Sequence, residues 1–372
     1  MRIGIMLRTL DEHGGIKVYS KNLVDELLRV DQKNEYVFFY RSPDQKGTYA
    51  DYPNVKEVVL GESNKIIWDQ FLLPRAAKRE SVDVIFNPKF TVPFFTSIKT
   101  VMTLHGADWF IPEHAQYYNP LDVRYIRLIM PLYCRKATRI ISISELTTYH
   151  FNRILGLPEG KIKTTYFGPA RFFRRETDEN KLQAVRNKYN LPERFIFSLT
   201  KYGMGGGNRK NIDKIFLAYE KYFQRQNDPL PLVLAGKDCE QYRHDYQILD
   251  TGYGAAIHFP GFVEQTDLPA IYSAAHFYLY PSNVEAFPIP LTEAMTCGTP
   301  VITSNVNGLK EIAGEAALFV DPGSVDDIAQ AMCRLDNETE LRDSLSQAGL
   351  ERSRMFSWEK CARETLELLE HV

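Results

Sequence analysis

Cysteine is scarce in this sequence and follows no pattern. The five cysteines are scattered, odd in number and without the Cys-x-x-Cys or Cys/His spacing of a metal site. This distribution argues against a disulfide framework and against a zinc site. We expect small, buried apolar residues at these positions, which are Cys134, Cys239, Cys297, Cys333 and Cys361.

Two common devices for holding phosphates are also missing. The sequence contains no Asp-x-Asp, the carboxylate pair that would carry a divalent ion on a diphosphate, and no Gly-x4-Gly-Lys-Ser/Thr loop. The second absence excludes a Walker site. Any bound phosphate must therefore be neutralised by cationic side chains and backbone dipoles, and we expect no metal.

Long apolar runs are absent as well. No stretch approaches the length of a membrane span, and the start, MRIGIMLRTLDEHGG, lacks the apolar region of a signal peptide. The 44% hydrophobic and 25% charged residues are typical of a globular protein, and 372 residues suit two domains of similar size. We expect a cytoplasmic protein.

Charge is unevenly divided along the chain. Residues 1–175 hold 26 Lys and Arg against 18 Asp and Glu, a balance of +8, whereas residues 176–372 hold 19 against 29, a balance of −10. The basic half is expected to face something anionic. Nothing in the sequence indicates nucleic acid as a partner.

The most informative stretch is residues 278–303, YLYPSNVEAFPIPLTEAMTCGTPVIT. It reads as a strand, a loop, a short helix that begins near Pro290 and stops at Gly298, and a second strand. Glu285 in the loop and Glu293 on the helix would lie at the carboxyl end of a strand, where open α/β sheets bind ligands. A carboxylate accepts two hydroxyl donors, as a sugar or ribose diol offers.

An isolated Glu-x7-Glu is more often two solvated glutamates, but the sequence around this pair matches a specific family signature. The run from Pro281 to Pro322 resembles, nearly position for position, the donor-site signature of family 4 glycosyltransferases, which are retaining enzymes of the GT-B fold. The resemblance implies that Glu285 faces the transferred sugar, that Glu293 holds the ribose, and that Phe287 and Ile289 contact the donor. Many members have Gly where this chain has Pro288, which has no N–H for sugar hydroxyls.

The amino-terminal segment indicates a second ligand loop. A strand over residues 2–10 is followed by Gly14-Gly15 and by a helix whose apolar residues, from Val18 to Leu28, share one face. Amides at a helix N-terminus favour phosphate. A plain glycine turn is the alternative, and the resemblance favours the donor diphosphate.

His105 is the candidate site residue of the first half. It follows a predicted strand directly, in TLHGADWFIPEH, and so lies at the carboxyl end of the sheet. A single histidine is more often structural. This context resembles the family loop in which the histidine reaches the donor sugar and the acceptor.

Two further segments complete the predicted donor site. In KYGMGGGNRKN, residues 201–211, Arg209 and Lys210 stand between a strand and a helix, where two cations could take the charge of a departing diphosphate. The triplet looks like the phosphate site of the family, although the glycine run before it is longer than usual. HFPGFVEQTDLPAIY resembles the base pocket, where backbone groups near Val263 and Leu268 read the nucleobase. Backbone reading leaves UDP and GDP donors equally open.

Residues 120–139, PLDVRYIRLIMPLYCRKATR, combine apolar residues with five cations. The apolar residues include Leu121, Tyr125, Leu128, Ile129, Leu132 and Tyr133. Such a basic amphipathic helix suits an anionic membrane surface. A domain helix with one core face is the favoured alternative, because Pro131 interrupts the pattern.

The strand and helix pattern predicts an α/β protein, and the resemblance makes it GT-B: two Rossmann-like domains facing across a cleft, with the last helix returning to the first domain. We place the acceptor domain at 1–172, the nucleotide-sugar domain at 173–355 and the returning helix at 356–372.

The expected function is transfer of a hexose, mannose-, glucose- or rhamnose-like, from a nucleoside diphosphate to a glycan or lipid-linked acceptor, without a cofactor or metal. The expected setting is cell-surface polysaccharide synthesis, with possible peripheral contact at the inner face of the membrane. Two alternatives stay open: a GT-B epimerase or sugar-phosphate synthase, and a non-catalytic nucleotide-sugar-binding subunit.

Overall fold

The computed structural model describes residues 1–12, 14–61, 64–203, 209–248 and 251–372. The chain forms two compact units. Unit 1 consists of Met1–Ala115, Pro120–Phe167 and Ser357–Val372, and unit 2 of Gln116–Asn119 and Gly168–Phe356. The main crossing of the chain thus lies at Phe167 and Gly168, where the sequence places a boundary after residue 172, and the return lies at Ser357 rather than residue 356.

Unit 1 is built on a seven-stranded parallel sheet with the order β3-β2-β1-β4-β5-β6-β7. The predicted first strand is too long, because the chain leaves the sheet after Met6 and forms a 3-10 turn, η1, at Arg8–Asp11. The strands are β1 (Arg2–Met6), β2 (Glu35–Tyr40), β3 (Val55–Val59), β4 (Val84–Asn87), β5 (Lys99–Leu104), β6 (Arg139–Ser142) and β7 (Ile162–Thr164).

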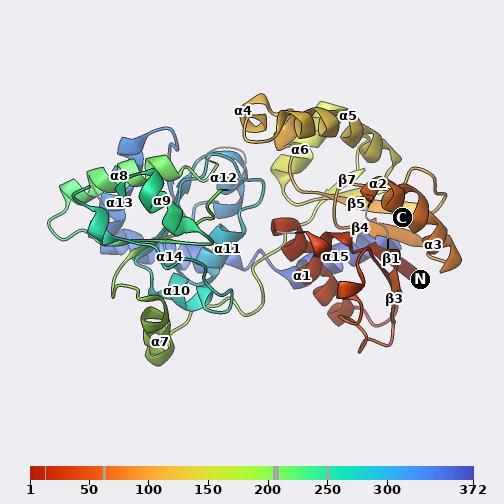
Figure 1. The fold of residues 1–372 in the computed structure, drawn as a ribbon, viewed down its shortest axis with the longest axis horizontal. Helices are drawn as coiled ribbons and strands as arrows, with labels where there is room; N and C mark the ends of the chain where they lie inside the picture. Colours follow the sequence, from red (N-terminus) through yellow and green to blue (C-terminus); the bar gives the residue numbers. More distant parts are fainter. Residues whose placement is uncertain (13, 62–63, 204–208, 249–250) are drawn as a thin grey trace. The chain divides into compact units, whose positions relative to one another are not determined.

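Helices cover both faces of this sheet, as parallel strands require. The helices are α1 (Gly15–Val30), α2 (Lys65–Ile67), the π-turn η3 (Trp68–Leu72), α3 (Leu73–Arg79), α4 (Pro112–Ala115), α5 (Pro120–Lys136), α6 (Glu145–Leu155) and α15 (Trp358–Glu370). The last helix, α15, packs against α1 (Figure 1), so the predicted return of the C-terminal helix to the first unit is confirmed. Trp358 of α15 stacks on Phe167 at 4.7 Å and meets Tyr19 of α1 edge-on at 5.5 Å.

Unit 2 repeats the plan with six parallel strands in the order β10-β9-β8-β11-β12-β13. The strands are β8 (Ile196–Leu199), β9 (Leu232–Ala235), β10 (Ile257–His258), β11 (Phe277–Tyr280), β12 (Val301–Ser304) and β13 (Leu318–Val320). The helices are α7 (Glu179–Tyr189), α8 (Ile212–Arg225), α9 (Tyr242–Asp245), α10 (Leu268–Ala274), α11 (Ile289–Thr296), α12 (Asn307–Ala313), α13 (Val325–Asn337) and α14 (Thr339–Ser353).

One predicted strand of unit 2 is largely wrong. The sequence favours a strand over residues 258–263, but β10 ends at His258. Pro260 has no N–H to give a neighbouring strand, and Gly261 adopts a φ of +74° that strands do not use. Residues 259–267 form a loop instead.

Each sheet has one point at which the strand order reverses. In unit 1 the reversal lies between β1 and β4, and in unit 2 between β8 and β11. Ligands of open parallel sheets bind outside the carboxyl ends of the strands at such points. The loops that follow these four strands are therefore the places to look for a site.

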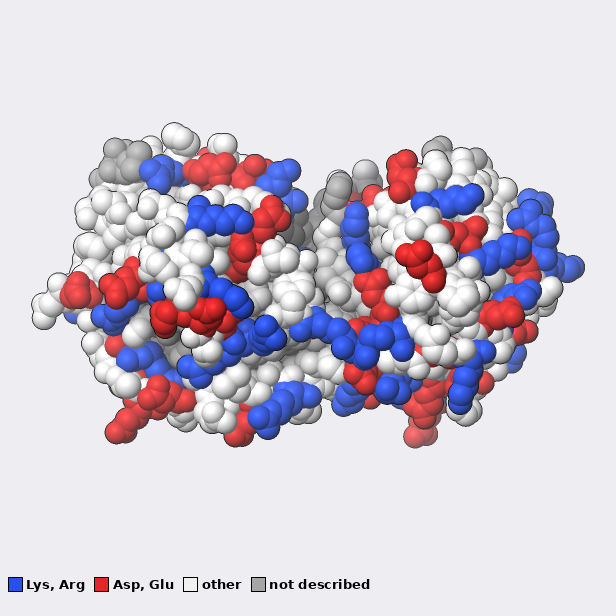
Figure 2. All heavy atoms as spheres, turned by 90° about the horizontal axis from the view of Figure 1, so that it is seen from below, with Lys and Arg blue, Asp and Glu red and all other residues white. Residues whose placement is uncertain are grey.

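The surface carries both signs of charge. Figure 2 shows Lys and Arg as well as Asp and Glu on each unit. Within the ranges given above, no helix is both long and apolar enough to cross a bilayer. All five cysteines are free thiols, and Cys333 alone among them is partly exposed.

Candidate active site

The loops after β8 and β11 bring together the two predicted cations and one predicted carboxylate of unit 2. Lys210 Nζ lies 2.6 Å from Glu285 Oε1, and Arg209 Nη2 lies 3.5 Å from Glu285 Oε2. Arg209 also donates to the Val284 carbonyl at 3.3 Å. The glycines at 205–207, part of the predicted phosphate loop, lie outside the described residues.

Tyr280, at the end of β11, contacts Lys210 of this cluster. The Lys210 ammonium group donates to the Tyr280 hydroxyl and lies 4.5 Å from the centre of its ring. Burial lowers the pKa of Lys210, although the carboxylate of Glu285 opposes the shift. The ammonium group is thus partly stripped of water, and this strengthens its interaction with a negative oxygen.

The backbone around the two cations is fixed by Asn211. This residue has a left-handed φ of +61°, and its side-chain amide donates to the carbonyls of Pro281 at 3.0 Å and Pro322 at 2.8 Å. The Asn283 N–H donates to the Arg209 carbonyl at 2.9 Å. The loops after β8 and β11 are therefore held together by buried hydrogen bonds.

Gly308 is a site residue that the sequence alone does not single out. Its N–H donates to the Glu285 carbonyl at 3.0 Å, and a Cβ at this position would lie 2.4 Å from the Ala286 carbonyl oxygen. Only glycine lets α12 approach the Glu285 loop this closely.

Glu293, on α11, is buried and accepts a hydrogen bond from the Tyr272 hydroxyl at 3.2 Å. Burial raises its pKa to about 7, while the bond from Tyr272 acts in the opposite direction. Tyr272, Tyr278 and Tyr280 form a buried row, with ring centres 5.2 and 5.6 Å apart. This row connects the Glu293 carboxyl to the Lys210 cluster.

The start of α11 offers few amide donors. Pro288 precedes the helix and Pro290 is its second residue, so Ile289 carries the first N–H. The amides of Leu291 and Thr292 donate to the Pro288 carbonyl at 3.1 and 3.3 Å. Phe287 is buried and packs edge-on against Phe356 at 5.9 Å, so its side chain is a core contact of the loop.

Val263, in the loop between β10 and α10, and Leu268, the first residue of α10, are both buried. The Gly236 N–H, after β9, donates to the Gly261 carbonyl at 2.8 Å, which holds this loop at the carboxyl edge of the sheet.

In unit 1, Gly14 and Gly15 stand at the start of α1. Gly14 is the N-cap with a φ of +100°, which favours glycine, and a Cβ at either position would meet no atom within 4 Å. The two residues border open space, as close approach of a ligand to their backbone requires.

His105 follows β5 and packs edge-on against Tyr19 of α1 at 4.7 Å. Its Nε2 lies 2.8 Å from the Pro88 carbonyl, so Nε2 carries the hydrogen and donates. Burial lowers the pKa of His105 to about 4, so the ring is neutral at pH 7. Its Nδ1 is consequently an acceptor, suited to a hydroxyl donor.

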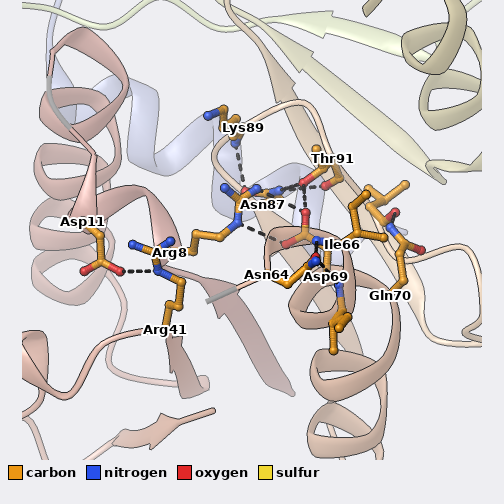
Figure 3. A network of polar contacts seen from close by, with 12 residues as sticks. Arg8, Asp11, Arg41, Asn64, Ile66, Asp69, Gln70, Asn87, Lys89 and Thr91 are labelled. Carbon is orange, nitrogen blue, oxygen red and sulfur yellow. Dashed lines mark hydrogen bonds and ion pairs between the residues drawn. The ribbon is translucent and has the colours of Figure 1, made fainter. Parts of the chain in front are cut away.

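A buried polar network occupies the reversal point of unit 1 (Figure 3). Arg8, after β1, makes two 3.1 Å bonds to the carboxylate of Asp69, and Thr91 donates to the same carboxylate at 3.0 Å. Asp69 lies in the π-turn η3, an irregularity often found near functional sites. Burial raises the pKa of Asp69, although Arg8 opposes the shift.

This network reaches the segment before the glycine turn. Glu12 accepts from Arg8 at 3.1 Å and from Lys89 at 2.7 and 2.8 Å. Lys89 follows Pro88, whose carbonyl holds His105. The loops after β1, β4 and β5 are thereby tied together.

Each unit, taken by itself, has groups that suit a phosphate or a hydroxyl. Unit 2 has two cations and two carboxyls, and unit 1 has a helix start and a neutral histidine. The sequence indicated these groups, but not the supporting Tyr280, Tyr272 and Gly308.

Known proteins resemble this chain in sequence and in fold. Residues 204–352 match the family described as glycosyl transferases group 1, and residues 13–168 match glycosyltransferase family 4. O-antigen chain mannosyltransferase B of Escherichia coli is 30% identical over 297 residues, which cover 78% of this chain and 75% of that protein. The uncharacterized glycosyltransferase MJ1607 of Methanocaldococcus jannaschii is 28% identical, with coverage of 95% and 93%.

Among solved structures, HepE of Anabaena in complex with UDP and glucose aligns with a TM-score of 0.75 at 18% identity, over 100% of both chains. Sucrose-phosphate synthase of Thermosynechococcus elongatus aligns with a TM-score of 0.75 at 20% identity, over 100% of this chain and 98% of that one. These likenesses confirm the predicted GT-B fold. Together with the family matches and the relative from Escherichia coli, they show that the chain belongs to the group 1, family 4 glycosyltransferases and is a glycosyltransferase.

Proposed function

We propose that this enzyme transfers a hexose from a nucleoside diphosphate to a hydroxyl of a glycan or lipid-linked acceptor, with retention at the anomeric carbon. The observation that carries the proposal is the joint placement of Arg209, Lys210 and Glu285 at the strand-order reversal of unit 2. A diphosphate needs the cations, and a sugar needs the hydroxyl acceptor.

Each group then has a role in one step. The bond from the anomeric carbon to the phosphate oxygen breaks, and the charge on that oxygen is stabilised by Arg209 and Lys210 of unit 2. Within unit 1, the amides at Gly14 and Gly15 are the groups suited to phosphate. The acceptor oxygen bonds to the same face of the sugar and passes its proton to the departing phosphate. In unit 2, Glu285 holds the sugar hydroxyls and Glu293 holds the ribose. In unit 1, His105 is the group suited to a hydroxyl donor.

Mannose is the first donor sugar to test, because O-antigen chain mannosyltransferase B is among the relatives. The decisive experiment is a panel of GDP- and UDP-hexoses, scored for nucleotide release and for a glycoside product with a glycan or lipid-linked acceptor. We expect both products from one donor. Nucleotide release without a glycoside would favour an epimerase or a sugar-phosphate synthase, and binding without release would favour a non-catalytic subunit.

We also propose that the reaction needs no metal, because two fixed cations serve the diphosphate and the sequence has no Asp-x-Asp. Turnover should be unchanged by EDTA. Loss of turnover in EDTA that magnesium restores would contradict this.

We further propose that α5 contacts an anionic membrane, where a lipid-linked acceptor for polysaccharide synthesis would be presented. The helix has a buried apolar face and a second, exposed apolar stripe formed by Leu121, Tyr125, Leu128 and Leu132. Leu121 is 78% exposed and Leu128 is 74% exposed. Arg124 and Arg135 on the same helix are exposed as well, which combines the apolar and cationic groups that an anionic bilayer attracts.

The apolar surface continues beside α5. Phe95 is 72% exposed and stacks on the exposed Phe71 with ring centres 5.9 Å apart. Lys136 at the end of α5 donates to the Thr96 carbonyl at 2.9 Å and thus ties this loop to the helix.

Vesicle sedimentation tests this contact. We expect binding to anionic but not neutral vesicles, loss at high salt, and weaker binding of Leu128→Ser and Arg124→Glu. Leu217→Ser is the matched control, because Leu217 is an exposed leucine on α8 of unit 2. Arg124 is preferred to Arg127, which donates to the Trp109 carbonyl at 2.5 Å and has a structural role. Equal binding to both vesicle types, or none, would refute the contact.

A further inference from the structure

The loop between Val263 and Leu268 is a closed turn. The Asp267 N–H donates to the Glu264 carbonyl at 3.0 Å, and Asp267 is also the N-cap of α10, where its carbonyl accepts from the Ile271 N–H at 3.2 Å. Val263 and Leu268, at the two ends of the turn, are buried, whereas the residues between them are largely exposed. The turn has little core of its own to fix its conformation.

Tyr189, the last residue of α7, spans this turn from outside. Its hydroxyl accepts from the Glu264 N–H at 3.1 Å and donates to Asp267 Oδ2 at 2.7 Å. Lys188 adds a 2.6 Å ion pair to the same oxygen. Figure 1 shows α7 beside α10, and the residues bridged are 75 and 78 positions apart in the sequence.

Helix α10 carries the turn at one end and a site contact further along. It starts directly after Asp267 and includes Tyr272, whose hydroxyl donates to Glu293. The two hydrogen bonds of Tyr189 therefore fix the start of the short helix whose Tyr272 binds Glu293, the carboxyl assigned to the ribose.

We propose that Tyr189 is a positioning residue that fixes the backbone groups of Val263 and Leu268 against the nucleobase and so sets the preference between uracil and guanine. The inference rests on the proposed function and on the resemblance of residues 258–272 to the family's base pocket, which implies that these backbone groups read the base. A backbone N–H or C=O discriminates between two bases only when its position is fixed. A turn that can shift would adapt to the hydrogen-bonding edge of either base. Tyr189 acts through the turn and touches no substrate.

Tyr189→Phe tests the inference, because it removes both hydrogen bonds and keeps the ring. The readouts are the dissociation constants of UDP and GDP by calorimetry, with KM and kcat for the preferred donor. We expect the preferred nucleotide to bind about 5–10-fold more weakly, the scale of one or two lost hydrogen bonds, and the other nucleotide to change much less. The preference ratio should fall while kcat stays within about twofold, because Lys210 and Glu285 are untouched.

A matched pair of lysines on α7 provides the control. Lys188→Ala removes the ion pair with Asp267 and should shift the preference in the same direction, whereas Lys181→Ala removes an ion pair with Glu176 and should not. The two side chains are 53% and 57% exposed, so neither variant threatens folding. Lys188→Ala also serves if Tyr189→Phe proves unstable.

The outcomes separate this inference from the proposed function. A wild-type enzyme that binds neither nucleotide would overturn both. A wild-type enzyme with a clear preference, which Tyr189→Phe and Lys188→Ala leave unchanged, would overturn only the role of Tyr189. Equal weakening of both nucleotides together with a lower melting temperature would likewise show that Tyr189 is merely structural.

Discussion

Lys210 Nζ lies 2.6 Å from Glu285 Oε1, so the cation assigned to the diphosphate and the carboxylate assigned to the sugar form one ion pair. The two residues are 75 positions apart in the sequence and follow neighbouring strands. A nucleotide sugar that enters must share Lys210 with Glu285. The carboxylate is thereby held in place before the sugar arrives, which is a form of preorganisation.

Lys210→Ala should lower kcat by roughly two orders of magnitude or more, the scale observed when one preorganised charge-stabilising group is removed. The variant also removes one of the two cations that pair with Glu285, and Arg209, at 3.5 Å, is the one that remains. Steady-state nucleotide release measures the effect. Lys221→Ala, which removes an exposed lysine from α8, is the control and should be neutral. Unchanged release in Lys210→Ala would remove Lys210 from the phosphate site.

Glu293→Gln should separate stability from donor binding. Burial raises the folded-state pKa of Glu293 to about 7 from 4.5, so the unfolded chain loses its proton first as pH rises. Stability is therefore lost between pH 4.5 and 7, by about 3 kcal/mol in total at 1.36 kcal/mol per pKa unit. Glutamine stays neutral, so the variant should unfold at higher temperature than wild type at pH 8 and at a similar temperature near pH 5. Scanning calorimetry measures this.

The donor KM should respond in the opposite sense. A ribose diol needs the ionised carboxylate, so the wild-type KM should rise about tenfold as pH falls from 8 to 6, while that of Glu293→Gln should be high and independent of pH. A wild-type KM that is flat from pH 6 to 8 would contradict the ribose assignment.

Gly308→Ala should disable the enzyme without unfolding it. The added Cβ would lie 2.4 Å from the Ala286 carbonyl oxygen, so the loop with Glu285 must move. A displacement near 1 Å at a positioned group costs up to about 100-fold in kcat/KM. Gly252→Ala is the matched control, since a Cβ there meets nothing within 4 Å. Equal activities of the two variants would show that the loop tolerates the shift.

Arg8→Met should destabilise unit 1 selectively. It leaves the Asp69 carboxylate buried without its main partner, a loss of about 3–5 kcal/mol when the carboxylate is charged. Without Arg8 the folded-state pKa of Asp69 rises further, so protonation at pH 5 should reduce the loss that is measured at pH 8.

The three tryptophans, Trp68, Trp109 and Trp358, all belong to unit 1, so fluorescence during urea unfolding reports this unit. Arg41→Met, which breaks the less buried pair with Asp11, is the control and should cost about 1 kcal/mol or less. Equal losses in the two variants would refute a special role for the Arg8–Asp69 pair.

The sequence predicted the features that local patterns encode. Glu285, Glu293, Arg209 and Lys210 stand in segments whose order of strand, loop and helix can be read from the sequence. Arg209, Lys210 and Glu285 lie in the loops that follow β8 and β11, and Glu293 lies on α11. The contact of Glu285 with Arg209 and Lys210 was not predicted, because it depends on which strands are neighbours.

The supporting residues were out of reach for the same reason. Tyr272 meets Glu293 across 21 positions, and Lys89 meets Glu12 across 77. Gly308 looked like any helix-start glycine until the Ala286 carbonyl was placed beside it. On α5 one apolar face is buried, as the domain-helix alternative predicts, and a second apolar stripe is exposed. Membrane contact stays a prediction.

The place of Trp358 has a consequence for how the chain matures. Its indole packs against Phe167 and Tyr19, so the core of unit 1 includes a residue that the ribosome adds after all of unit 2. During synthesis, unit 2 has its full sequence while unit 1 still lacks α15. The amino-terminal unit is synthesised first, but the face of α1 that packs against α15 stays uncovered until the end of the chain is made. This unit is therefore the last to be completed.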